Sequence, residues 1–167
     1  RCFQILEAKG SKGPYSLYDP CCGGAYLLTV FGFLHPERIR SILASDINAD
    51  VLGIAERNLA LLSVSGLNKR IKQIKDNIQL YNKDSHRSAL ESAERLSSSL
   101  SGSNITKVTI FQRDVTSSSH NNKISDRVHI VLTDLPYGEL VTWRSNSSNP
   151  VNDFMNNVHE LLDHSHS

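Results

Sequence analysis

The feature that most constrains this chain is the stretch from Leu17 to Thr29, where a short apolar run ends in Asp19 and a glycine pair follows. Gly23 and Gly24 lack a Cβ, so the backbone can turn sharply there and a ligand can approach it closely. The apolar segment that begins near Ala25 is long enough for a helix, whose first N–H groups would point into the turn. This order of strand, tight turn and helix predicts the first unit of a nucleotide-binding α/β sheet.

Length and composition limit the class of protein. A chain of 167 residues, 39% of them hydrophobic, is long enough for one domain with a substantial core. The net charge of +1 does not mark the whole chain as nucleic-acid-binding, so any basic surface must be local. The 3 cysteines form neither a disulfide framework nor a zinc motif, and no apolar run reaches membrane-spanning length. We therefore expect a cytoplasmic protein whose thiols are reduced. Nothing in the sequence requires more than a monomer, so we expect a monomer.

Short apolar runs that end in an acid recur along the chain. We expect strands at 16–19, 41–47, 107–115 and 127–135. Helices are expected at 2–8, from 26 to about 35, after a cap at Asn48 or Asp50, and at 151–162. This alternation predicts a mainly parallel sheet covered by helices. Because the last strand would be unpaired on one side, we expect the intact protein to have further strands outside this chain.

The segment 63–104 departs from this alternation and is interpreted as a helical insertion. One helical pattern carries Ile71, Ile74 and Ile78, and a second carries Ala89, Leu90, Ala93, Leu96 and Leu100. The first pattern also holds four cations, Lys69, Arg70, Lys72 and Lys75. A charge cluster on a helix is by default a solvated face, and an RNA substrate would make phosphate contact an equal alternative.

Acidic residues close the predicted strands, and they are Asp19, Asp46, Asp114 and Asp134. Ligands of an open α/β sheet bind beyond the carboxyl ends of the strands, where the strand order reverses. All four acids are therefore expected in one crevice.

The residue types in this crevice suit S-adenosylmethionine. Its methionine part would lie against the glycine turn, Asp46 would accept the ribose hydroxyls, and Asp114 would accept from the adenine amino group. The predicted cofactor-binding residues are Asp19, Cys21, Gly23, Gly24, Asp46, Ile47, Asp114 and Val115. A nicotinamide-dependent dehydrogenase shares the first two elements but does not need the turn Asp134-Leu135-Pro136-Tyr137, so it is the more distant alternative.

That turn resembles the [Asn/Asp]-Pro-Pro-[Tyr/Phe] motif of methyltransferases that act on planar nitrogens of bases or amides. Five segments together resemble the avilamycin-resistance AviRa family of 23S ribosomal RNA guanine methyltransferases, from about Phe3 to Leu162. They are Asp19-Pro-Cys-Cys-Gly23, Tyr26-Leu-Leu-Thr-Val30, Ala44-Ser-Asp46, Asn58-Leu-Ala-Leu-Leu-Ser63 and Thr133-Asp-Leu-Pro-Tyr-Gly-Glu139.

The resemblance implies a Rossmann-like methyltransferase domain over residues 1–167, with S-adenosylmethionine as cofactor and 23S ribosomal RNA or the large ribosomal subunit as partner. It also implies a link to antibiotic resistance. Two positions depart from the motifs. Ala25 replaces the second glycine of the family turn, where a Cβ is expected to crowd the cofactor. Leu135 stands where the broader motif has proline, and the family shares that leucine.

The resemblance assigns the catalytic turn to Asp134, Leu135, Pro136 and Tyr137. Tyr137 would stack on an unpaired or flipped base, while the Asp134 side chain and the Leu135 carbonyl would accept hydrogen bonds from it. No nucleophilic side chain is needed, so Cys21 and Cys22 are interpreted as small turn and core residues. Two alternatives stay open: methylation of an amino group on DNA or an amide on protein, and an inactive RNA-binding module.

Overall fold

The computed structural model describes residues 1–117, 124, 127–136, 143, 145 and 147–162. In this part of the chain four parallel strands form one sheet in the order β3-β2-β1-β4. The strands are β1 Tyr15–Asp19, β2 Ile39–Asp46, β3 Lys107–Gln112 and β4 Ile130–Val131. The helices are α1 Cys2–Ala8, α2 Tyr26–Leu34, α3 Ala49–Ala60, α4 Val64–Tyr81, α5 Asp84–Ser99 and α6 Pro150–His159. The predicted α/β fold is confirmed, and the strand order reverses between β1 and β4.

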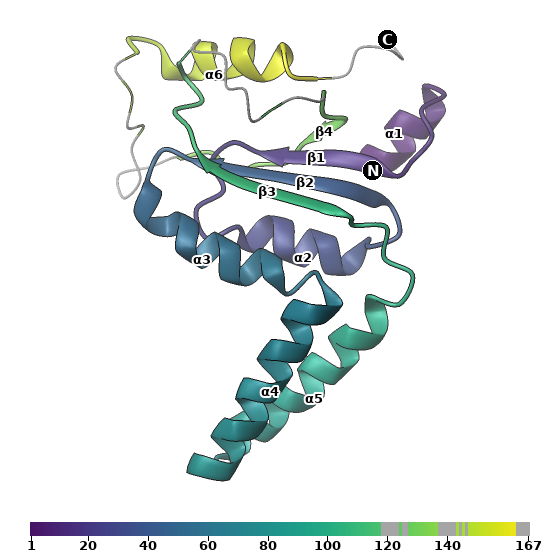
Figure 1. The fold of residues 1–167 in the computed structure, drawn as a ribbon. Helices are drawn as coiled ribbons and strands as arrows, with labels where there is room; N and C mark the ends of the chain where they lie inside the picture. Colours follow the sequence, from purple (N-terminus) through teal and green to yellow (C-terminus); the bar gives the residue numbers. More distant parts are fainter. Residues whose placement is uncertain (118–123, 125–126, 137–142, 144, 146, 163–167) are drawn as a thin grey trace.

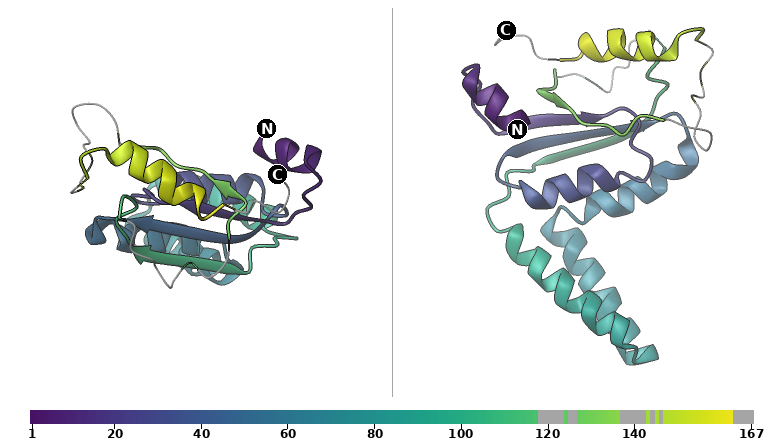
Figure 2. Two further views of the ribbon diagram at one scale, coloured as in Figure 1. Left: turned by 90° about the horizontal axis from the view of Figure 1, so that it is seen from above. Right: turned by 180° about the vertical axis from the view of Figure 1, so that it is seen from behind.

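The sheet lies between two helical layers. Helices α2 and α3 cover one face and α6 covers the other, as the two side views show (Figures 1 and 2). Leu17 belongs to the apolar cluster beneath α2 and α3, whereas its neighbour Tyr18 packs with Leu43 and Phe111 on the opposite face. Successive strand residues point to opposite faces, so a strand whose two faces are both covered is buried at every position, polar residues included. This explains why every residue of β1 is buried.

Two predicted strands are shorter than expected. The segment 107–115 leaves the sheet after Gln112, because the Asp114 side chain accepts from the Thr116 backbone N–H at 2.9 Å and bends the chain into a turn. The segment 127–135 pairs as a strand only at Ile130–Val131. In the described part of the chain its neighbour in the sheet is β1, which ends at Asp19, so little partner backbone remains beyond Val131 for a longer ladder.

The predicted insertion forms a projecting pair of helices, α4 and α5, and residues 64–100 are called the arm. Its two helices pack on each other through Leu67, Ile74, Ala93 and Leu100. Phe33 and Leu61 of the main body contact this cluster at its base. In Figure 1 the arm extends beyond α2 and α3, away from α6. Among the described residues, no helix combines the length and apolar character needed to cross a membrane.

The joint between α3 and the arm depends on Gly66. A Cβ at this position would lie 2.0 Å from the Ala60 carbonyl oxygen, which is backbone and cannot swing aside. We expect Gly66→Ala to lower the free energy of unfolding by about 3 kcal/mol. The matched control is Gly53→Ala in α3, where the nearest atom is Arg57 Nη1 at 3.8 Å; it should raise that free energy by roughly 0.5–1 kcal/mol. Urea denaturation measures both, and equal effects would contradict the packing account.

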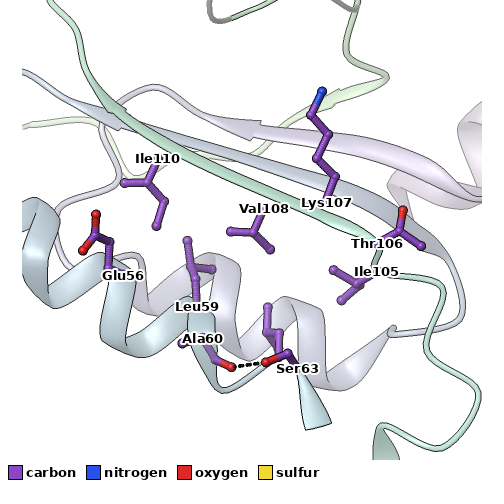
Figure 3. A pocket seen from close by; sticks show the side chains of 10 residues that line it. Glu56, Leu59, Ala60, Ser63, Ile105, Thr106, Lys107, Val108 and Ile110 are labelled. Atoms are coloured by element: carbon purple, nitrogen blue, oxygen red, sulfur yellow. Dashed lines mark hydrogen bonds between the residues drawn. The ribbon is translucent and has the colours of Figure 1, made fainter. Parts of the chain in front are cut away.

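A hollow of about 370 Å³ lies between α3 and the edge strand β3. Leu59, Val108 and Ile105 border it, as Figure 3 shows. The lining comes from the last turns of α3 and the first residues of β3, so the hollow is at the opposite end of these elements from the acids that close β1 and β2.

Candidate cofactor and catalytic site

Asp46, at the end of β2, connects the glycine turn to α3. Its Oδ2 accepts from the Gly23 N–H at 2.8 Å, and its Oδ1 accepts from the Asn48 N–H at 2.9 Å. A carboxylate has about four acceptor sites, so two stay available for hydroxyl groups of a ligand. Of the two predicted helix caps, Asn48 is the one used: its Oδ1 accepts from the Asp50 N–H at 3.1 Å.

A side chain of α3 holds the glycine turn in place through a hydrogen bond. Gly23 has a φ of +51°, a conformation that glycine adopts without strain. The Gly24 carbonyl accepts from Asn58 Nδ2 at 2.8 Å, and a Cβ at Gly24 would lie only 3.2 Å from Ile54. Asn58 lies in one of the family-like segments, yet the sequence assigned it no role. The structure shows that it ties α3 to the turn.

Ala25 does not present its methyl group as the sequence suggested. The residue is 0% exposed and belongs to the core cluster with Leu28 and Ala55. Its φ of 55° is left-handed, which costs an L-residue roughly 1–2 kcal/mol. The expected crowding of the cofactor by this Cβ is therefore replaced by a local backbone strain at the start of α2.

Asp19, the last residue of β1, is a buried carboxyl at only 2% exposure. Burial, with smaller contributions from the Asp46 and Asp134 carboxylates, raises its pKa to about 6, while the Thr133 side chain and the Cys21 N–H partly offset the rise. Its Oδ1 accepts from the Cys21 N–H at 3.1 Å. Asp19, Asp46 and Asp134 are thus close enough to interact, as the predicted crevice requires.

The raised pKa of Asp19 makes stability depend on pH. The folded state holds this proton more tightly than the unfolded state, so the contribution to stability is largest below about pH 4 and is lost as the pH rises to about 6. We expect Asp19→Asn to be more stable than the parent by about 2 kcal/mol at pH 7, with the difference vanishing near pH 4. Urea denaturation between pH 4 and 8 would measure this. A difference independent of pH would refute the assignment.

Asp114 and its neighbour are placed beyond β3. Besides the backbone N–H of Thr116, the Asp114 Oδ1 accepts from the Thr116 hydroxyl at 2.6 Å. Val115 is buried against Phe154 of α6, and its carbonyl accepts from Asn157 Nδ2 at 2.8 Å. Its N–H is the backbone group that would donate to a cofactor ring.

Ile47, the other predicted backbone contact, lies between β2 and α3 and is half-buried. Its carbonyl accepts from Gln112 Nε2 at 2.9 Å. The acceptor of this residue is therefore already used by β3.

The two adjacent thiols of the turn, Cys21 and Cys22, are expected to be unreactive at neutral pH. Burial, together with the Asp19 and Asp46 carboxylates, raises the pKa of both Cys21 and Cys22 to about 12. Thiols with such pKa values are poor nucleophiles at neutral pH.

The predicted catalytic turn is only partly described. Asp134 is exposed, Pro136 is half-buried, and Leu135 packs against the cluster that contains Val115 and Phe154. Tyr137 lies outside the described residues. The turn follows β4, next to β1, so Asp134 reaches the same edge of the sheet as Asp19.

The predicted RNA-binding cations are not part of this crevice. Lys69, Arg70, Lys72 and Lys75 are all exposed, and all lie on α4 in the arm. The described residues contain no group of three or more potential metal ligands.

A glycine turn after β1 and acids after β2, β3 and β4 are typical of open α/β proteins that bind a nucleotide cofactor, and the superposition on solved methyltransferases places the fold in the Rossmann-like methyltransferase class. The family model for the rRNA methyltransferase AviRa matches residues 1–167, and the chain belongs to this family.

Comparisons with individual proteins agree with this assignment. The chain is 36% identical over 146 residues to the 23S rRNA (guanine(2535)-N(1))-methyltransferase of Streptomyces viridochromogenes, an alignment that covers 84% of this chain and 57% of that protein. Two solved structures of the rRNA methyltransferase AviRa from the same organism superpose with TM-scores of 0.81 and 0.83 at 34% identity. Each match covers 97% of this chain and 67% of the other. The chain thus spans little more than half the length of the first relative.

Proposed function

We propose that this protein transfers a methyl group from S-adenosylmethionine to a guanine base of 23S ribosomal RNA. The observation that carries the proposal is the convergence of Asp19, Asp46 and Asp134 around the glycine turn in a chain of this family. The relative of known specificity acts on guanine N1 of the same RNA. An RNA of the large ribosomal subunit places the reaction in the cytoplasm. A monomer is sufficient, because one chain supplies all the predicted cofactor-binding residues.

The residues at the edge of the sheet fit this cofactor. S-adenosylmethionine supplies a methyl group that is electrophilic because it is bonded to a positively charged sulfur. Three carboxylates around the turn give that cation a favourable electrostatic environment. Asp46 retains acceptor sites for two ribose hydroxyls, and Asp114 offers its remaining oxygen to an adenine amino group.

Asp134 is the group proposed to act on the base. Methylation at N1 forms a nitrogen–carbon bond, breaks the carbon–sulfur bond and releases the N1 proton. Asp134 is exposed at the crevice and accepts a hydrogen bond from the N1–H group, which orients the nitrogen, and the proton passes to water as the new bond forms. The Leu135 carbonyl and Tyr137 would orient the base, and a base held in line reacts faster because its alignment is already established. A paired base is out of reach, so the target must be unpaired or flipped.

Transfer of a labelled methyl group tests the proposal directly. Three separate reactions each contain the protein, labelled S-adenosylmethionine and one substrate. The substrates are a 23S ribosomal RNA transcript, duplex DNA and total protein. We expect label in the RNA and a reverse-transcription stop at one guanine, because a methyl group on N1 blocks base pairing. Label in DNA or protein instead would support the alternative methyltransferases. RNA binding without transfer would support an inactive module.

A further inference from the structure

The arm has a positive net charge, whereas the net charge of the rest of the chain is negative. Residues 64–100 hold 7 Lys or Arg against 4 Asp or Glu, a net charge of +3, so the remainder of the chain sums to −2. The cofactor edge is lined by Asp19, Asp46, Asp114 and Asp134, which repel phosphate groups. A polyanionic substrate must therefore be attracted by cations at another place, and the arm supplies them.

On α4 the cations point away from the packing seam. Ile74 faces α5, whereas Lys72 and Lys75, three positions apart, share an exposed side of the helix. Arg70 projects about 200° away from Lys72 around the helix and donates to Gln73. Among the described residues, neither Lys72 nor Lys75 forms an ion pair with an acidic side chain. These two lysines are therefore available to one phosphate backbone.

The tip of the arm adds an aromatic surface. Tyr81, the last residue of α4, is 61% exposed and lies beyond the last apolar residue that packs in the seam, Ile78. Its ring meets the edge of the His86 ring at 6.1 Å between centroids, which restricts its orientation. Lys83 follows two residues later and is exposed. An exposed ring beside a cation is the arrangement on which single-stranded bases stack.

The outer part of the arm contributes little to the main body. Its base contacts Phe33 and Leu61, whereas the remaining apolar residues of the seam pack only on the partner helix of the arm. Figures 1 and 2 show the tip projecting past the α2 and α3 layer. The tip is therefore exposed on a part of the arm that does not pack against the sheet or its helices.

We infer that the arm is a second RNA-binding element, separate from the crevice, that contacts phosphates through Lys72 and Lys75 and stacks an unpaired base on Tyr81. The inference rests on the proposed RNA substrate and extends it. It divides the substrate contacts into two places: the crevice holds the reacting guanine, and the arm holds RNA at a distance from it.

Binding of a 23S ribosomal RNA transcript at several salt concentrations tests the phosphate contacts. Lys72→Gln combined with Lys75→Gln should reduce the slope of log affinity against log salt by about 1.4–1.8, because each phosphate contact contributes roughly 0.7–0.9. The matched control, Lys9→Gln with Lys12→Gln, removes the same charge from exposed positions outside the arm and should leave the slope unchanged. Equal slopes for the two double variants would overturn the inference.

The tip is tested by two substitutions of one residue. Tyr81→Ala should weaken binding of the transcript about tenfold, whereas Tyr81→Phe, which keeps the ring, should bind within twofold of the parent. Tyr81→Ala should raise KM for RNA and leave kcat unchanged, because the reacting atoms lie elsewhere, whereas Tyr81→Phe should change neither. Alanine is a better helix former than tyrosine, so the arm should fold in both variants. If Tyr81→Ala binds as well as Tyr81→Phe, the stacking contact is wrong.

Three further outcomes separate the hypotheses. If the parent protein binds RNA through the arm but transfers no methyl group, the proposed function fails and the arm assignment stands. If methyl transfer occurs and the arm variants behave like the control, only the arm assignment fails. If the arm variants bind the bare transcript normally but no longer bind large ribosomal subunits, the arm contacts a ribosomal protein instead of RNA, and the inference is overturned.

Discussion

Replacing Asp46 by alanine is expected to weaken the binding of S-adenosylhomocysteine by about 100-fold or more. Hydrogen bonds to a charged group contribute roughly 1.5–3 kcal/mol each, and this carboxylate would lose two from the ribose. It would also lose its bonds to the Gly23 and Asn48 N–H groups, which fix the turn against α3. Calorimetric titration of the parent and the variant measures the ratio of dissociation constants.

A neighbouring acid provides the control for this substitution. Asp50 is exposed in the first turn of α3 and lies next to the cap rather than at the strand end. Asp50→Ala should therefore change the dissociation constant by less than threefold. Asp46→Asn should fall between the two, because an amide has one carbonyl acceptor instead of two. Similar affinities for Asp46→Ala and Asp50→Ala would remove Asp46 from the cofactor site.

Replacing Asp134 by alanine is expected to lower kcat for methyl transfer at least 100-fold while the affinity for S-adenosylhomocysteine changes less than threefold. The side chain is proposed to hold the base through a hydrogen bond, and loss of correct placement at a reacting centre costs about that factor. Its location after β4, away from the Gly23 and Asn48 contacts of Asp46, explains why cofactor binding should survive. Single-turnover methylation of the RNA transcript separates the chemical step from binding.

The amide variant provides the comparison for Asp134. The related motif accepts Asn or Asp at this position, so Asp134→Asn should retain activity within about tenfold of the parent, since its carbonyl still accepts a hydrogen bond. Both variants remove the negative charge, and only alanine also removes the acceptor. Equal activity of the two variants would show that the acceptor at this position has no part in the reaction.

The strand-end acids were predictable because parallel strands bring their carboxyl ends to one edge whatever the loop lengths. Asp19 and Asp46 accordingly lie where the sequence placed them. The ends of the strands were less predictable: the Asp114 side chain competes for backbone N–H groups, and this shortens β3. A pattern of apolar residues also does not show how long the neighbouring strand is, and that length limits a strand such as β4.

Other features depended on tertiary placement. Periodicity identifies which side of α4 is apolar, but it does not give the direction in which the helix leaves the domain, so the distance of Lys72 from the crevice could not be inferred. Asn58 was missed because an amide on a helix has no distinctive pattern until the turn it holds is located. The complete burial of Ala25 in the core cluster was not predictable, because it depends on how α2 packs on the sheet.

The paired thiols of the glycine turn have a consequence for handling the protein. With pKa values raised to about 12, the Cys21 and Cys22 thiols stay protonated at neutral pH. Alkylating reagents and mild oxidants act on thiolates, so both residues should be spared under conditions that modify a freely ionising cysteine. A maleimide fluorophore could therefore be placed elsewhere, for instance on an engineered cysteine at the tip of the arm, without disturbing the turn.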